Sequence, residues 1–298
     1  MHNPFAEKIE ENESDIGYIE RALDGDAAAL ESLVLRHQSW IFNIALNMTG
    51  DIQHAEDVTQ EILIKMISKL SSYDPQKAAF RTWLYRIVAN HVINMKESRK
   101  EKFFAAHAVD FDFNKYFDNL PDTKNPSSAG KKETAEETKN YCVLCILLCL
   151  TRMERLVLVL GAIFDVTDRV GAEICEISRD NFRKILSRSR RKVFQYFKEN
   201  CSLVNDRNRC KCSELAPRLI KLGVIGKGSL IAGQNSLGTI RSMLGNTVAT
   251  IENEYRIFFD LYQEQPFLQG PDMVSWLRDL ISRSNLQKIF NETPILKM

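Results

Sequence analysis

The chain has 298 residues, 44% of them hydrophobic, and a formal net charge of +1. Its length predicts two or three domains. Because the net charge is so small, any binding of nucleic acid must depend on local basic surfaces. The longest apolar run, YCVLCILLCL, is ten residues long, which is too short to span a membrane. Because the polar N-terminal sequence lacks the apolar stretch of a secretory signal, and seven cysteines without such a signal favour reduced thiols, we expect a cytoplasmic protein.

Residues 15–102 are predicted to form a compact bundle of helices. Apolar residues recur at i, i+3, i+4 and i+7 in three successive segments of this block. Asp26 and Asp51 are suited to cap the first two of these helices, and Gly50 and Pro75 are suited to end them.

The second and third helices of this block carry opposite charges. HAEDVTQEILIKM places Glu56, Asp57, Gln60 and Glu61 away from its apolar stripe. FRTWLYRIVANHVINMKESRKEK, residues 80–102, has six basic residues against two acidic ones, a local charge of +4. Such a run suits a surface that follows a nucleic-acid backbone and stacks on bases. The alternative is a solvated helix face, which is common.

The order of these segments resembles region 2 of bacterial RNA polymerase sigma factors of the extracytoplasmic-function (ECF) type. The matches are AEDVTQE, FRTWLYRIVAN and the basic tail, across about eighty residues. The resemblance implies that Asp57, Gln60 and Glu61 contact the largest subunit of core RNA polymerase. It implies that the next loop and helix bind and open the minus-ten promoter element. The residues that this assigns to DNA are Arg81, Trp83, Arg86, Asn90, Arg99 and Lys100. Where primary sigma factors have a Trp-Trp pair, this chain has Trp83 and Leu84, which implies more sequence-restricted strand opening.

This division between two partners is physically consistent. Carboxylates at i and i+4 repel phosphate but can pair with basic residues of a protein. The alternative is that Glu61 pairs with Lys65 on its own helix, which contributes only about 0.3–0.5 kcal/mol at a surface.

Residues 103–139 are predicted to be a linker, because they combine Pro, Ser, Gly and acidic residues without sustained periodicity. Residues 140–200 form a second helical block. Within it Thr151 and Glu154 match a capping box, and DRVGAEICEISRDNFRKILSRSRRKVFQYFK has the pattern of a helix-turn-helix with its turn at Ser178. The second helix of that motif is expected to bury Phe182, Leu186, Val193 and Phe197.

The segment AEICEISRDNFRKILSRSRRKV resembles region 4 of the same family, whose second helix reads the minus-thirty-five element in the major groove. From residue 179 to 198 there are eight basic residues against one acidic residue, a local charge of +7. The residues that position assigns to base edges or phosphates are Arg179, Asn181, Arg183, Lys184, Arg188, Arg190 and Arg191. Two departures put the turn geometry and some phosphate contacts in doubt: Glu176 stands where Gly is usual, and Ile185 where Arg is frequent.

Residues 201–298 extend beyond this resemblance and are predicted to form a small helical regulatory or interaction module. A helical stripe is expected over 236–264, followed by two short helices in PDMVSWLRDLISRSNLQKIF. Cys201, Cys210 and Cys212 are weak candidates for a zinc or redox site, because a closed zinc site needs a fourth ligand. The other interpretation is that they pack as free cysteines.

The sequence therefore predicts an all-α sigma factor that directs promoter-specific transcription initiation, with core RNA polymerase, promoter DNA and the melted minus-ten strand as partners. An anti-sigma factor is left open as a further partner. The alternative function is a helix-turn-helix regulator that acts without being a polymerase subunit, but this leaves AEDVTQE and RTWLYRIVAN unexplained. No nucleophile, metal or phosphate-binding constellation supports an enzyme, and no cofactor is expected beyond the open question of zinc.

Overall fold

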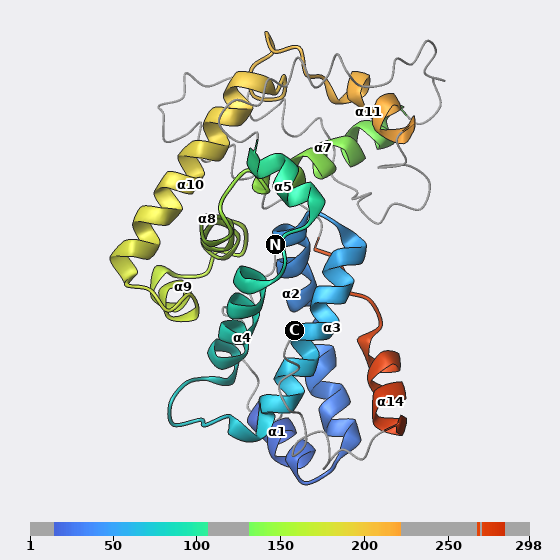
Figure 1. The fold of residues 1–298 in the computed structure, drawn as a ribbon, viewed down its shortest axis with the longest axis vertical. Coiled ribbons are helices and arrows are strands. Elements are labelled where there is room, and N and C mark those ends of the chain that lie inside the picture. The colour runs from blue at the N-terminus through green and yellow to red at the C-terminus, as the bar shows by residue number, and fades with distance from the viewer. Residues whose placement is uncertain (1–14, 107–130, 222–266, 269, 284–298) are drawn as a thin grey trace. The chain divides into compact units, whose positions relative to one another are not determined.

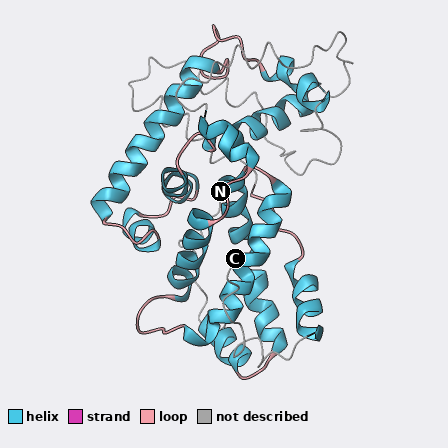
Figure 2. Cartoon of the chain, viewed as in Figure 1, coloured by secondary structure: helices cyan, strands magenta, loops and turns pink. Residues whose placement is uncertain are grey.

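The computed structural model describes residues 15–106, 131–221, 267–268 and 270–283 (Figure 1). All the secondary-structure elements assigned within these ranges are helices (Figure 2), which confirms the all-α class. The described residues divide into two compact units. The N-terminal unit contains residues 15–96, 166–182, 268 and 270–283, and the second unit contains residues 97–106, 131–165, 183–221 and 267. The expected stripe over 236–264 and the last short helix lie outside the described residues.

The N-terminal unit is built on consecutive helices, two of which begin at a capping aspartate. Its main elements are α1 (Asp15–Leu23), α2 (Ala27–Thr49), α3 (Ile52–Lys69), η2 (Leu70–Ser72) and α4 (Phe80–Asn94). The Asp26 side chain accepts hydrogen bonds from the first turn of α2, and the Asp51 side chain accepts one from the first turn of α3. Gly50 ends α2 in the left-handed conformation, with φ 64°. The predicted caps are confirmed.

The described C-terminal residues 268 and 270–283, here called the C-terminal strap, also belong to this unit and lie on α2. The Asn43 side chain donates to the Leu268 carbonyl oxygen (2.8 Å) and accepts from its amide (3.1 Å). The Gly270 amide donates to Ser39 Oγ at 3.3 Å. A Cβ at Gly270 would lie 3.3 Å from Phe42 Cβ, so the strap approaches α2 too closely for a larger residue to fit without displacement.

The helix of the strap, α14 (Met273–Arg283), is the first of the two short helices predicted for this region. Met273 and Leu277 are buried, and the Met273 amide donates to the Gln38 side chain at 3.2 Å. Arg278 forms a two-pronged ion pair with Glu31 of α2, at 2.9 and 2.8 Å. Apolar burial and backbone recognition together fix the strap to α2.

The second unit contains α5 (Arg99–Ala106), α7 (Lys131–Leu147), α8 (Arg152–Leu158), the π-helical turn η3 (Val159–Ile163), most of α10 (Arg179–Asn200) and α11 (Cys212–Lys221). Thr151 and Glu154 form the predicted capping box at the start of α8. Glu154 also pairs with Lys192 of α10, at 2.6 Å. The first turn of α8 is therefore joined to the middle of α10.

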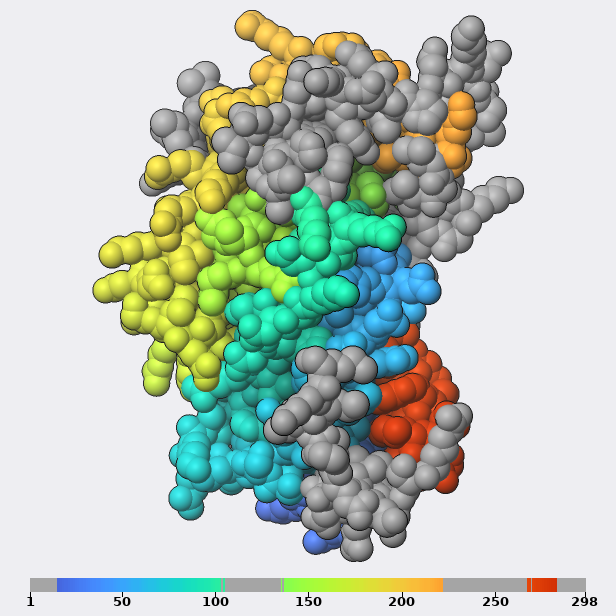
Figure 3. Space-filling model, viewed as in Figure 1, coloured from blue at the N-terminus to red at the C-terminus, as the bar shows by residue number. Residues whose placement is uncertain are grey.

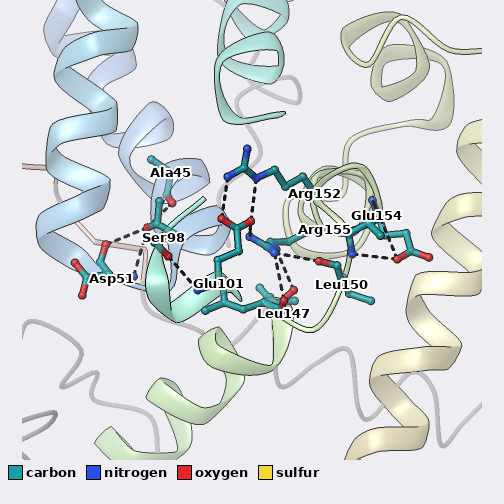
Figure 4. A network of polar contacts seen from close by, with 12 residues as sticks. Ala45, Asp51, Ser98, Glu101, Leu147, Leu150, Arg152, Glu154 and Arg155 are labelled. Carbon is teal, nitrogen blue, oxygen red and sulfur yellow. Dashed lines mark hydrogen bonds and ion pairs between the residues drawn. The ribbon is translucent and has the colours of Figure 1, made fainter. Parts of the chain in front are cut away.

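A buried ion network fastens α5 to α8 within the second unit (Figure 4). The Glu101 carboxylate accepts hydrogen bonds from Arg152 at 2.9 Å and from Arg155 at 3.1 Å. Arg155 is 1% exposed and also donates to the carbonyl oxygens of Leu147 and Leu150, each at 3.0 Å. Burial opposes ionisation of Glu101, but the two arginines hold its pKa below the usual value. Removing Glu101 would leave Arg155 as a buried charge without its partner, which is strongly destabilising.

The helix-turn-helix predicted from sequence begins with α9 (Asp168–Ile174) and continues into α10 at Arg179. An added Cβ at Gly171 would lie 2.4 Å from the ring of Phe182, so the two helices approach too closely here for any larger side chain. Glu176 adopts φ 54°, the left-handed conformation that Gly usually provides. The turn therefore has the left-handed conformation that Gly would give it, although this conformation is sterically unfavourable for a residue with a Cβ.

This strain can be measured by replacing Glu176 with Gly and, separately, with Ala. Both changes remove the exposed side chain, but only Ala retains a Cβ at positive φ. We expect Glu176→Gly to be more stable than Glu176→Ala by about 0.5–1 kcal/mol, allowing for the larger unfolded-state entropy of Gly. Thermal melting of the full chain by circular dichroism measures the difference. Equal melting temperatures would contradict a left-handed turn at this residue.

Candidate functional site

The first candidate surface is the acidic face of α3. Asp57 and Glu61 are exposed and Gln60 is half-buried. The opposite face of the helix buries Val58, Ile62 and other apolar residues against the bundle. The three predicted residues therefore share one accessible face, as i, i+3 and i+4 spacing requires.

Glu61 lies close to a buried histidine of α4. His91 is 6% exposed, and its Nε2 lies 3.2 Å from Glu61 Oε2. Its Nδ1 lies 2.6 Å from Lys65 Nζ. Burial and the nearby Lys65 charge lower the pKa of His91 to about 4. The imidazole is therefore neutral at pH 7, so that Nδ1 accepts from Lys65 and Nε2–H faces the carboxylate.

Arg81, which the resemblance assigns to DNA, lies beside a buried carboxylate. Asp15 of α1 is within 2.9 Å of Arg36 Nε, 3.2 Å of His37 Nε2 and 3.5 Å of Arg81 Nε. Burial opposes ionisation of Asp15, yet the hydrogen bond from His37 and the charges of Arg36 and Arg81 hold its pKa below the usual value. The Arg81 side chain is only 12% exposed. A phosphate would have to compete with Asp15 for it.

Trp83 stands in an aromatic group at the start of α4. Its ring stacks on the Phe80 ring, with centroids 5.5 Å apart. The Tyr73 ring, which precedes the loop before α4, also has its centroid 5.5 Å from that of Trp83. Phe80 is buried, whereas Trp83 is half-buried. The indole is thus fixed in orientation and still partly accessible, as a base-stacking residue requires.

The remaining predicted DNA residues before the linker fall into different surroundings. Arg86 of α4 donates to the Glu173 backbone oxygen and carboxylate of α9, both at 3.1 Å, whereas Asn90 is exposed. Arg99 and Lys100 lie on α5 in the second unit, where Lys100 stands 4.6 Å above the Tyr141 ring. The structure therefore does not gather these residues and those of α4 in one unit.

The second candidate surface is the basic face of α10. Basic residues are prominent among the exposed side chains of this helix, which belongs to the yellow segment of Figure 3. The predicted residues that are exposed are Arg179, Asn181, Arg183, Lys184, Arg188 and Arg191. Arg179 also pairs with Asp168 of α9 at 2.8 Å. Four positive side chains spaced at i, i+1, i+5 and i+8 from Arg183 suit a helix that lies along a nucleic-acid groove.

The inner face of α10 corrects one expected detail. Phe182, Val193 and Phe197 are buried as predicted, but Leu186 is only half-buried and Ile185 is buried in its place. The aliphatic residue at 185, where the family often has Arg, therefore serves the core. Arg190 is also turned partly inward, because its guanidinium donates to the Gly161 oxygen at 3.3 Å and burial lowers its pKa.

The cysteine candidates gather without forming a metal centre. Cys201, Cys210 and Cys212 line one small cavity together with a fourth thiol, Cys142 of α7. Within the described ranges, no group of three or more His, Cys, Asp or Glu side chains is arranged to hold a metal ion. None of the described helices has the length and apolar character needed to cross a membrane.

Comparison with known proteins identifies the family of the chain. Residues 33–102 match the sigma-70 region 2 family. RNA polymerase sigma-H factor of Pseudomonas aeruginosa is 33% identical over 133 residues, covering 44% of this chain and 68% of that protein. ECF RNA polymerase sigma factor SigW of Bacillus subtilis is 30% identical over 86 residues, covering 29% of this chain and 46% of that protein. A solved structure of CnrH with the cytosolic domain of CnrY gives a TM-score of 0.44 at 20% identity, covering 62% of this chain and 98% of that one.

Residues 33–102, which include most of α2 and all of α3 and α4, thus match sigma-70 region 2, the class expected from the acidic and basic segments. The chain belongs to the RNA polymerase sigma factor family and is of the ECF type. It is a promoter-directing transcription initiation factor.

Proposed function

We propose that this sigma factor binds core RNA polymerase through Asp57, Gln60 and Glu61 of α3. The observation that carries the proposal is that α3 presents all three on one accessible face while its apolar stripe is buried. This face lies within the residues that match sigma-70 region 2. Carboxylates in this arrangement favour a basic protein surface and disfavour DNA.

We propose further that promoter DNA is read by the other surfaces. Trp83 and Asn90 on α4 are placed to engage the melted minus-ten strand, since one is a partly exposed ring and the other an exposed amide. The outward side chains of α10 engage the minus-thirty-five duplex. Those near its start are suited to base edges, and Arg188 and Arg191 are suited to phosphates.

The C-terminal extension is proposed to regulate the region 2 domain through the strap. The strap covers part of α2 by the contacts of Asn43, Ser39 and Glu31. A covered surface is closed to other partners, so release of the strap is expected to change what α2 can contact. An anti-sigma factor is a further partner that such a surface would admit.

Polymerase binding is tested by combining Gln60→Ala with Glu61→Lys. We expect affinity for core RNA polymerase to fall about tenfold or more, because one favourable charge contact is lost and one repulsive contact is gained. Titration with core polymerase measures the affinity, and a melting scan checks the fold. Glu20→Lys, which reverses an exposed carboxylate on α1, is the matched control. A folded double mutant with unchanged affinity would refute the assignment of α3.

The proposed roles along α10 are tested by comparing two arginines. Arg183→Ala should cost about 1–3 kcal/mol on a cognate minus-thirty-five element and relax its sequence preference, whereas Arg191→Ala should weaken all duplexes alike and reduce the salt slope by about one unit. Binding titrations at several salt concentrations measure both. Arg207→Ala, at an exposed arginine after α10, is the control. Equal losses for both mutants on specific and random duplexes would contradict the assignment.

The regulatory proposal is tested by loosening the strap without shortening the chain. Gly270→Val introduces atoms into the close contact with α2, and Arg278→Glu places two carboxylates together at Glu31. Both should increase hydrogen exchange across 270–283 and raise affinity for core polymerase. Adding Glu31→Arg to Arg278→Glu should reverse both effects. Faster hydrogen exchange with unchanged polymerase affinity would show that the strap does not regulate the binding of core polymerase.

A further inference from the structure

Four cysteines of the second unit gather where α7, the end of α10 and the start of α11 meet. Cys142 lies on α7, Cys201 directly follows α10, and Cys212 begins α11 two residues after Cys210. All four line a cavity of about 30 Å³, whose other walls are largely apolar. They are close enough that the other three thiols add to burial in raising the pKa of Cys142. The sequence gives no reason for four thiols to share one cavity.

Two of these cysteines are partners in a backbone pairing. Cys201 and Cys210 form an isolated parallel β-bridge, and the Ser202 amide donates to the Cys210 carbonyl oxygen at 3.1 Å. Paired backbones of this kind lie about 4.8 Å apart. Disulfides usually join Cα atoms about 4.4–6.8 Å apart. The backbone therefore already has a spacing that a Cys201–Cys210 disulfide requires.

The loop between these two cysteines is held closed by its own hydrogen bonds. The Asn208 side chain donates to the Lys198 oxygen at 3.0 Å and to the Cys201 oxygen at 3.2 Å. The Val204 and Asn205 amides also donate to the Cys201 oxygen, at 3.2 and 3.0 Å. The two ends of the loop are thus positioned before any sulfur–sulfur bond is made, which lowers the entropy lost on forming it.

We propose that Cys201 and Cys210 are an oxidative modification site that forms a reversible disulfide and fastens the end of α10 to the start of α11. With hydrogen peroxide as oxidant, the Cys201 thiolate attacks a peroxide oxygen, the O–O bond breaks, and a sulfenic acid and one water result. The Cys210 sulfur then attacks the Cys201 sulfur and displaces the second water. Two thiols lose two protons and two electrons, and one peroxide becomes two waters.

The surroundings of the two thiols indicate that Cys201 is the one that reacts with peroxide first. Burial raises the pKa of both thiols, but the amides of Leu203 and Val204 face Cys201 and partly offset that effect. Cys201 is half-buried, whereas Cys210 is 8% exposed. The oxidant therefore reaches Cys201 more readily, and Cys210 acts as the resolving thiol.

A zinc ion held by several thiolates is the other chemistry that such a cavity suggests. Among the residues that the structure describes, however, no three such ligands are already arranged around one point. The paired backbone at Cys201 and Cys210 favours a two-sulfur bond over a site that needs four converging sulfurs.

The test uses the reduced full-length protein treated with hydrogen peroxide, followed by thiol titration and peptide mapping. Seven free thiols should fall to five, since one disulfide consumes two, and trypsin should yield residues 199–207 joined to 210–211. Dithiothreitol should restore all seven. Cys201→Ser and Cys210→Ser should each abolish the joined peptide, whereas Cys142→Ser and Cys212→Ser should retain it. A melting scan of each variant verifies the fold.

Several results would overturn the proposal. Seven thiols remaining after oxidation, or a principal cross-link through Cys142 or Cys212, would assign the bond elsewhere or exclude it. One zinc per reduced chain, lost in all four Ser variants, would identify the cavity as a metal site. These measurements do not involve polymerase or DNA, so their outcome is independent of the proposed promoter-directing function.

Discussion

A single buried carboxylate, Asp15, joins three helices of the N-terminal unit. It meets Arg36 and His37 from α2 and Arg81 from α4, so α1, α2 and α4 share one centre of charge. Because a buried charge is tolerated only when it is paired, each of these helices is restrained in rotation about its own axis. The outward direction of Trp83, two residues beyond Arg81, follows from that restraint. The partly exposed ring on α4 thus depends on an acid located at the first residue of α1.

The features predicted correctly from sequence are those whose chemistry lies within a few residues. The caps at Asp26 and Asp51 and the capping box at Thr151 each depend on amides two or three positions away. The acidic face of α3 follows from helical spacing alone. The turn at Glu176 was in doubt because sequence shows only that Gly is missing, whereas the backbone shows that Glu can take its conformation in this protein.

What sequence reasoning missed are the partners of charged side chains. Nothing near Arg81 in the sequence indicates Asp15, 66 positions earlier, and nothing near His91 indicates Glu61. A basic residue on a predicted helix is therefore assigned to solvent or DNA by default. The error of placing Leu186 rather than Ile185 in the core has a different cause. Adjacent positions differ by 100° around a helix, so a small error in the assumed register changes which of the two side chains is expected to be buried.

The contact between the strap and α2 can form only late in the synthesis of the protein. Asn43 and Leu268 are separated by 225 positions, and chains emerge from the ribosome at about 5–20 residues per second. Helix α2, to which Asn43 belongs, is therefore synthesised well before Leu268. During that interval the face of α2 stands uncovered on every nascent chain. Any partner that recognises this face meets it first during translation, before the strap has been synthesised and can compete for it.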